Sequence, residues 1–122
     1  MVKISFNGSS SSFSGTIIEG SGSTVSSFQQ GQFAGAYEGA SFTSNTFSNN
    51  EIYIPNYTSS NYKSFIADSV TENNSSTAYS ELIAGLWSNT AAITSITLST
   101  SNVDLFVQYS KFSLYGVLRQ GI

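Results

Sequence analysis

Apolar and polar side chains alternate in short runs along this chain, and turn residues separate the runs at intervals of about ten residues. The first run places Val2, Ile4 and Phe6 on one face and stops at Asn7-Gly8. Residues 51–54 repeat the pattern until Pro55, which cannot donate a hydrogen bond to a β-ladder. A period of two with turns at this spacing predicts β-strands in an all-β fold.

Further strands are expected by the same criterion at residues 16–19, 62–70, 79–87, 93–98, 103–109 and 111–118. Residues 79–87 are apolar on both faces, which is typical of a central strand buried on both sides. A short helix is the alternative for this segment, because Ala78, Leu82 and Leu86 lie four residues apart. Residues 28–37 mix aromatic side chains with glycines and alanines, so we expect another backbone to approach closely there.

These elements predict one domain, residues 1–122, with an all-β fold. Two antiparallel sheets packed face to face are the natural arrangement for about eight short strands. We therefore expect an antiparallel β-sandwich with jelly-roll-like connections.

The composition argues against several classes of protein. Only 9% of residues are charged, aromatic residues make up 14%, and the net charge is -3, which indicates a folded chain without a basic stripe for nucleic acid. No apolar run reaches the roughly 20 residues that span a bilayer, and residues 1–10 lack the apolar core of a signal peptide. We expect neither a nucleic-acid nor a membrane partner.

Chemistry that needs an activated side chain has little support. The chain has no histidine and no cysteine, so its many serines lack the usual activating base and no zinc–thiolate site can form. A glycosidase would need two carboxylates facing one cleft, and any two of the seven acidic residues could meet in space. We expect no enzyme activity, no catalytic residues and no cofactor.

One turn carries several oxygen ligands. Asp68, Glu72, Asn73 and Asn74 lie in or before residues 71–77, and calcium takes six to eight such oxygens. The spacing does not fit an EF-hand loop, and Asn and Asp favour turns through their own local hydrogen bonds. A solvated turn is therefore the preferred interpretation, and we expect no metal site.

Three aromatic residues next to turns are the candidate surface contacts: Tyr57, Tyr62 and Trp87. Aromatic faces beside amides and hydroxyls suit both sugars and protein interfaces. For Trp87 the competing interpretation is packing at a corner of the core, because large aromatic side chains are usually well buried.

Four stretches of the chain resemble a family of jelly-roll-like structural proteins of tailed bacteriophages, found on the head or tail surface. They are KISFNGSSSSFSG (3–15), EIYIPNY (51–57), residues 62–98 with LWSNTAAITSITL at their end, and FVQYSKFSLYGV (106–117). The resemblance covers most of the chain and attaches no mechanism to any position. It implies a virion protein that recognises and assembles with other virion proteins, either the major capsid protein or tail components.

Three functions follow for testing. The first is a head decoration (cement) subunit, which we expect to be a homo-oligomer and to form a trimer, because the chain is short and has no fibre-like repeat. The second is a tail or fibre-tip receptor-binding module that recognises host surface glycans. The third is a non-viral secreted adhesin, which the missing signal peptide disfavours.

The sequence also departs from the family pattern. Members of the family usually have one or two more strands before the KISFNG motif, whereas here Met1 lies only two residues upstream of Lys3. The strand that contains Ile4 and Phe6 is therefore expected to have an open edge. We expect another subunit or virion protein to close this edge by strand addition.

Overall fold

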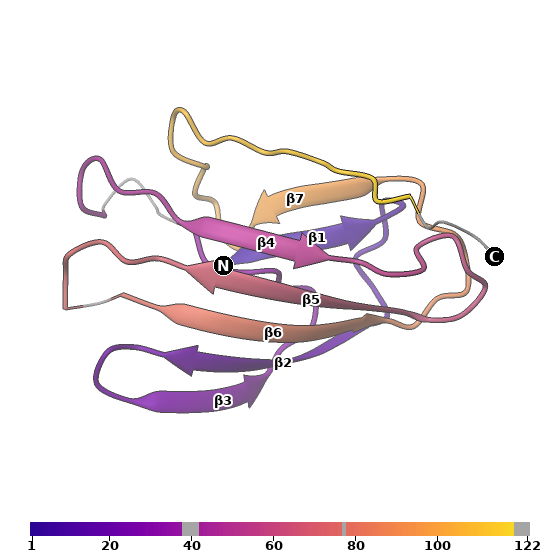
Figure 1. Ribbon diagram of the computed structural model, residues 1–122, viewed down its shortest axis with the longest axis horizontal. Coiled ribbons are helices and arrows are strands. Elements are labelled where there is room, and N and C mark those ends of the chain that lie inside the picture. The colour runs from indigo at the N-terminus through magenta and orange to yellow at the C-terminus, as the bar shows by residue number, and fades with distance from the viewer. Residues whose placement is uncertain (38–41, 77, 119–122) are drawn as a thin grey trace.

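The computed structural model describes residues 1–37, 42–76 and 78–118, and within them the chain forms seven strands and no helix (Figure 1). In chain order the strands are β1 (Val2–Phe6), β2 (Phe13–Gly20), β3 (Val25–Gln29), β4 (Asn49–Tyr53), β5 (Lys63–Val70), β6 (Ser80–Trp87) and β7 (Ile96–Thr100). The predicted all-β class is confirmed, with seven strands in place of the expected eight or so.

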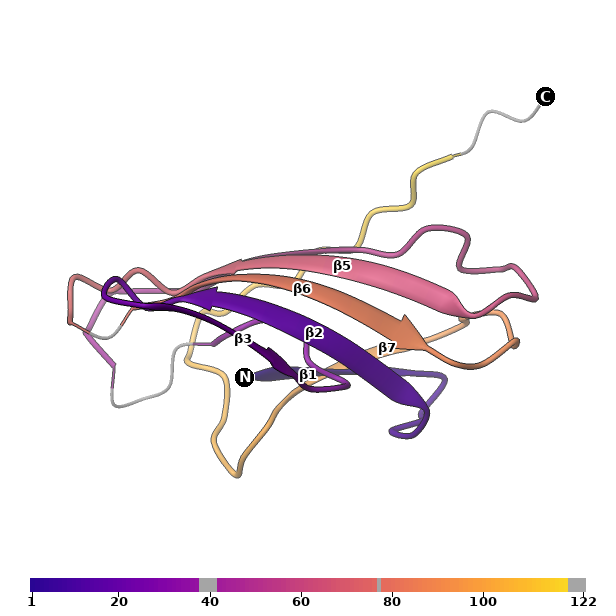
Figure 2. The ribbon, with the colours of Figure 1, turned by 90° about the horizontal axis from the view of Figure 1, so that it is seen from below.

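The strands form two antiparallel sheets, one in the order β1-β7 and one in the order β3-β2-β6-β5-β4. The pairing is nested, because β1 pairs with β7 and β2 pairs with β6. Such nesting is what jelly-roll-like connections produce when the chain crosses between sheets. The larger sheet arches over the β1-β7 pair (Figure 2), so the predicted β-sandwich is confirmed.

The core lies between the two sheets. Inward positions of β5 and β6 alternate with exposed ones, as expected for strands with one buried face. Phe6 of β1 reaches across to the larger sheet, with its ring 5.8 Å from Phe65 and 5.5 Å from Trp87. The buried cluster consists of Ile4, Phe6, Ile17, Ala34, Phe65, Ala67, Ile83, Trp87 and Ile93.

Strand β6 is the middle strand of the five-stranded sheet, so the helical alternative for residues 79–87 is wrong and the central-strand prediction is confirmed. The expectation that both faces are buried is only half correct. Ile83 is buried on the inner face, but Leu82 and Ala84 are exposed on the outer face. Within residues 1–37, 42–76 and 78–118, only the inner face of β6 is covered.

The turn after β1 uses the residues predicted to end that strand. Asn7 and Gly8 both have positive φ, 53° and 72°, and the N–H of Ser9 donates to the carbonyl of Phe6. Asn and Gly tolerate this left-handed backbone better than other residues. The Asn7 side chain also reaches the segment before β7: its Oδ1 accepts from the N–H of Thr94 at 2.7 Å, and its Nδ2 donates to the carbonyl of Ala92 at 2.8 Å.

The predicted open edge of the first strand is not present. One edge of β1 pairs with β7, and residues 32–35 cover the other, where the N–H of Val2 donates to Gly35 and that of Ile4 donates to Gln32. The predicted close approach within residues 28–37 is confirmed at Gly31, where a Cβ would lie 2.6 Å from the Phe13 carbonyl oxygen. Small residues thus bring this segment in to fill the edge that the sequence left open.

Two predicted strands are wrong. Residues 103–109 and 111–118 have the alternating pattern of strands, yet the structure assigns no strand to them. They follow β7 as a segment that runs above β7 and β4 in Figure 1 and borders the cavity between the two sheets. A strand needs a backbone partner as well as a pattern, and these residues have no partner strand among the described residues.

Candidate functional site

The three candidate contact residues lie at one end of the sandwich. Trp87 ends β6 and pairs with Lys63, the first residue of β5. Tyr57 and Tyr62 belong to the connection between β4 and β5, and the Tyr57 carbonyl accepts from the N–H of Ile93. The structure therefore brings all three residues into one corner.

Within this corner Trp87 is not a surface contact. Only 1% of the residue is exposed, and its ring stacks on Phe13 at 6.2 Å in addition to its edge contact with Phe6. Aromatic rings at these separations stabilise a core beyond the apolar area that they bury. The corner-packing interpretation is correct for Trp87, and its assignment as a surface contact is wrong.

Lys63 holds the corner together, although no sequence pattern singled it out. It is 1% exposed, and its Nζ donates to the carbonyls of Asn61 at 2.7 Å and Asn89 at 3.3 Å. The same ammonium lies 6.0 Å from the Trp87 ring centroid, at the outer limit of a cation–π contact. The sequence did contain a signal for this role. Lys63 lies two residues before Phe65 and four before Ala67, so it shares their inward face of β5, where an apolar side chain is expected.

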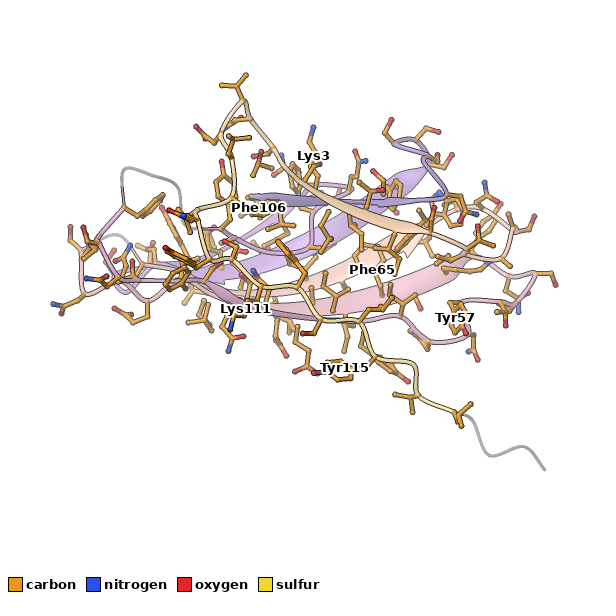
Figure 3. All side chains as sticks on the ribbon, turned by 90° about the horizontal axis from the view of Figure 1, so that it is seen from above. Lys3, Tyr57, Phe65, Phe106, Lys111 and Tyr115 are labelled. Carbon is orange, nitrogen blue, oxygen red and sulfur yellow. The ribbon has the colours of Figure 1, made fainter. Side chains whose placement is uncertain are left out.

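Tyr57 and Tyr62 are exposed, at 52% and 59%, and are free to meet a partner (Figure 3 labels Tyr57). They do not form a hollow. Neither lines either of the two cavities described next. Ligand sites for small molecules and sugars are usually concave, so these two tyrosines lack the shape of such a site.

The first cavity, of about 490 Å³, is shallow and lies where residues 29–31 meet β2 and β6. The second, of about 550 Å³, lies between the sheets on the side of β4 and β7. Ile52 and Ile54 line the second cavity from one sheet, and Ile96 and Leu98 line it from the other. Residues from 106 to 114 border it on the outer side.

An exposed apolar patch covers the outer face of the five-stranded sheet, and we call it the outer-sheet patch. Its members come from four adjacent strands: Ile18, Tyr53, Ile66, Leu82 and Ala84. Ile18 faces Leu82 directly, Ile66 faces both Ala84 and Tyr53, and the four larger members are 48–54% exposed. The patch is therefore continuous across the middle of the sheet.

Two acidic residues border this patch. Asp68 of β5 faces Leu82 on one side and Glu51 of β4 on the other. Like charges placed directly opposite in a sheet repel each other, so this pair is unfavourable in the isolated chain. A cation on a partner would remove that repulsion.

A second carboxylate pair is formed by Glu19 and Glu81, which face each other on β2 and β6. Glu81 is buried, and burial together with the charge of Glu19 raises the pKa of Glu81 to about 7 from its ordinary value of 4.5. The Met1 amino group opposes this increase. Neither carboxylate lines either of the two cavities described above.

The turn of oxygen ligands is organised by local hydrogen bonds. The N–H of Ser75 donates to Asn73 Oδ1, and the N–H of Asn74 donates to Glu72 Oε1. Asp68 instead lies within β5 and points away from the core. Among residues 1–37, 42–76 and 78–118, no group of three or more acidic side chains is arranged to hold a metal ion.

No helix in the described part of the chain has the length and apolar character needed to cross a bilayer. Comparisons of the sequence with protein-family models and with curated proteins, and of the fold with solved structures, find no match. The geometry of the surfaces therefore carries the functional argument.

Proposed function

We propose that this chain is a non-enzymatic structural protein of a tailed-bacteriophage virion, and specifically a head decoration subunit that stabilises the capsid through protein–protein contacts. The outer-sheet patch carries the assembly part of this proposal. Strand β6 has the sequence of a strand that is buried on both faces, and the described residues cover only one of them. The phage assignment rests on the resemblance of the motifs described above.

The chemistry of the patch fits a lasting contact with another protein. Permanent interfaces resemble a protein core cut in half, and half-exposed aliphatic and aromatic side chains on a sheet provide such a surface. Contiguous apolar patches on soluble proteins mark interaction sites. The acidic pair Glu51 and Asp68 at its border favours a partner with a lysine or arginine in register.

Imaging of purified virions that contain this chain tests the location. We expect regular copies over the capsid lattice, and we expect particles without the chain to disassemble at a lower temperature. Copies confined to the tail or fibre ends, or unchanged disassembly without the chain, would contradict the decoration role.

A substitution on the patch tests the contact surface. We expect Ile66→Asp to weaken binding to undecorated capsids by at least about tenfold, because it places a charge at the centre of an interface. Val103→Asp is the matched control, because Val103 is 99% exposed and lies outside the patch. Both chains are first checked for an unchanged circular dichroism spectrum, and equal binding by the two variants would exclude the patch as the contact.

The exposed pair Tyr57 and Tyr62 supports a second candidate, a receptor-binding module at the tail or fibre tip. Exposed tyrosines on one connection are a common element of glycan and protein contacts. A glycan array probed with the purified chain tests this function. Binding that is lost in Tyr62→Ala, with the fold retained, would favour it over the decoration role.

A further inference from the structure

The segment after β7 has the features of a β-strand that lacks a partner. Four residues of 113–118 are apolar and more than 80% exposed: Leu114, Tyr115, Val117 and Leu118. In the part of the chain that the structure describes, residues 111–118 make no backbone hydrogen bond. A segment with a strand's side-chain pattern and unpaired backbone groups is a template for pairing with a sheet edge.

Contacts upstream anchor residues 104–112 to their own sandwich. The Tyr37 hydroxyl donates to Asp104 at 2.8 Å, the Phe106 ring packs against Tyr37 at 6.2 Å, and Phe112 packs against Phe106 at 5.0 Å. Figure 3 shows Phe106, Lys111 and Tyr115 in sequence along the segment, with Phe65 in the interior. Beyond this anchor the yellow end of the chain runs out past the five-stranded sheet (Figure 2).

The same chain has an edge that could accept a strand. The carbonyl of Ser95 accepts from Asn7, and the N–H of Ser101 donates to Met1, so odd-numbered positions of β7 face β1. Because backbone groups alternate in direction along a strand, those of Ile96, Leu98 and Thr100 face away from β1. No strand of the described residues pairs with this side of β7.

An apolar cavity lies beside this free edge, and residues 106–114 of the same chain border it on the outer side. The cavity of about 550 Å³ between the sheets is lined by Ile96 and Leu98 of β7 and by Ile52 and Ile54 across from them. A strand added along β7 would place every second side chain into this cavity. In an extended chain Leu114 and Leu118 lie on one face of residues 113–118 and Tyr115 and Val117 on the other, so either face has the apolar character that the cavity requires.

We propose that residues 113–118 of one copy add as a strand to the free edge of β7 in a second copy. The same chain has both the unpaired segment and the unpaired edge of β7. Two identical copies can therefore form the missing backbone hydrogen bonds with each other, without any other partner. Exchange of an element between identical chains is a low-cost route to oligomers, and a head-to-tail exchange closes when the rotation between copies completes a ring. This self-association goes beyond the proposed decoration role and does not depend on it.

Cysteine pairing in the full-length chain tests the exchange, because the natural chain has no cysteine. Chains with Ser99→Cys in β7 are mixed with isotope-labelled chains that carry Ser113→Cys or Tyr115→Cys. We expect mixed disulfides between the two kinds of chain to form under mild oxidation. Val103→Cys is the control, because it is fully exposed but lies outside the exchanged strand. Cross-linking no faster than with this control would overturn the proposal.

The mass of the purified chain in solution gives a second readout. We expect a multiple of the 13.0 kDa chain mass for the natural chain and for Val103→Asp, and a monomer for Leu114→Asp/Val117→Asp. Leu114 and Val117 are 85% and 84% exposed, so the double variant should fold as the natural chain does. A monomeric natural chain, or an unchanged mass in the double variant, contradicts strand exchange. Either result leaves the decoration role to be decided by the virion images.

Discussion

At the scale of single residues, the Phe65 ring packs directly on the backbone of Gly85, and it leaves no room there for a side chain. The two residues face each other on β5 and β6. A Cβ on Gly85 would overlap three carbon atoms of the Phe65 ring. A glycine in a central strand normally weakens it, since glycine has no side chain to pack. Here the aromatic ring takes the place of that side chain.

We therefore expect Gly85→Ala to lower the free energy of unfolding by about 1–3 kcal/mol, because the Phe65 ring must move out of its place in a filled core. The midpoint of urea denaturation measures this loss. Gly20→Ala is the matched control, since Gly20 is also a strand glycine but the nearest atom to its Cβ would be 4.0 Å away. An equal loss in both variants would mean that strand glycines, and not the ring, set the cost.

Glu81 makes stability depend on pH. Its pKa is about 7 in the folded chain and lower in the unfolded chain, so the native state favours the protonated form. Stability is full below the unfolded value of 4.5 and falls as the pH rises from there through about 7, by on the order of 1–2 kcal/mol once solvent screening of the carboxylate is allowed for. Urea denaturation at about pH 5 and about pH 8 measures the difference.

Glu81→Gln provides the comparison for this pH dependence. Glutamine has the shape of the protonated acid and does not titrate, so the fall in stability between about pH 5 and about pH 8 should largely disappear in the variant. The Met1 amino group interacts with Glu81, and its own pKa is lowered chiefly by burial, so the pH dependence that remains in the variant reports this amine. An identical pH profile in the two chains would remove Glu81 as the cause.

At the scale of elements, Asn7 joins the end of β1 to the start of β7. Its side chain bonds Ala92 and Thr94 from a left-handed backbone. Asn7→Ala should lower the free energy of unfolding by about 1–3 kcal/mol, through lost hydrogen bonds and the cost of alanine at positive φ. Asn7→Gly should lose less, because glycine adopts this backbone freely. Thermal unfolding ranks the two, and the reverse order would show that the backbone conformation is not strained.

The sequence predicted those elements that have both an alternating pattern and a partner strand among the described residues. The segments 62–70 and 79–87 became β5 and β6 almost residue for residue, because inward Phe65 and Ile83 have core to fill. The prediction failed at residues 103–109 and 111–118, where the alternating pattern is real and the backbone partner is missing. Periodicity reports which side chains suit a strand and says nothing of where the partner comes from.

The candidate site shows the same division. Tyr57 and Tyr62 are exposed as expected, since they lie beside turns, but Trp87 is covered by Phe6 and Phe13, which come from distant parts of the sequence. Burial at a corner depends on such long-range contacts. The sequence did not predict the outer-sheet patch, because apolar residues on both faces of β6 indicate a strand that is covered on both sides.

At the scale of the whole molecule, uncovered surface is the dominant feature. The outer-sheet patch lies on one face of the sandwich, and residues 113–118 extend from its side (Figure 2). Because only 9% of its residues are charged, the chain has little electrostatic repulsion to prevent such surfaces on different copies from associating. Both surfaces become buried if copies of the chain join through residues 113–118 and the resulting oligomer binds its partner through the outer-sheet patch.

The pairing of β1 with β7 also sets the order in which the sandwich can form. Val2 lies opposite Thr100, so the smaller sheet joins strands that stand at nearly opposite ends of the described chain. Closing so long a loop is slow, and folds that depend on distant pairings form in milliseconds to seconds. During synthesis β1 has no partner strand until β7 has left the ribosome. Until then Ile4 and Phe6, which end up fully buried, have no β7 beside them.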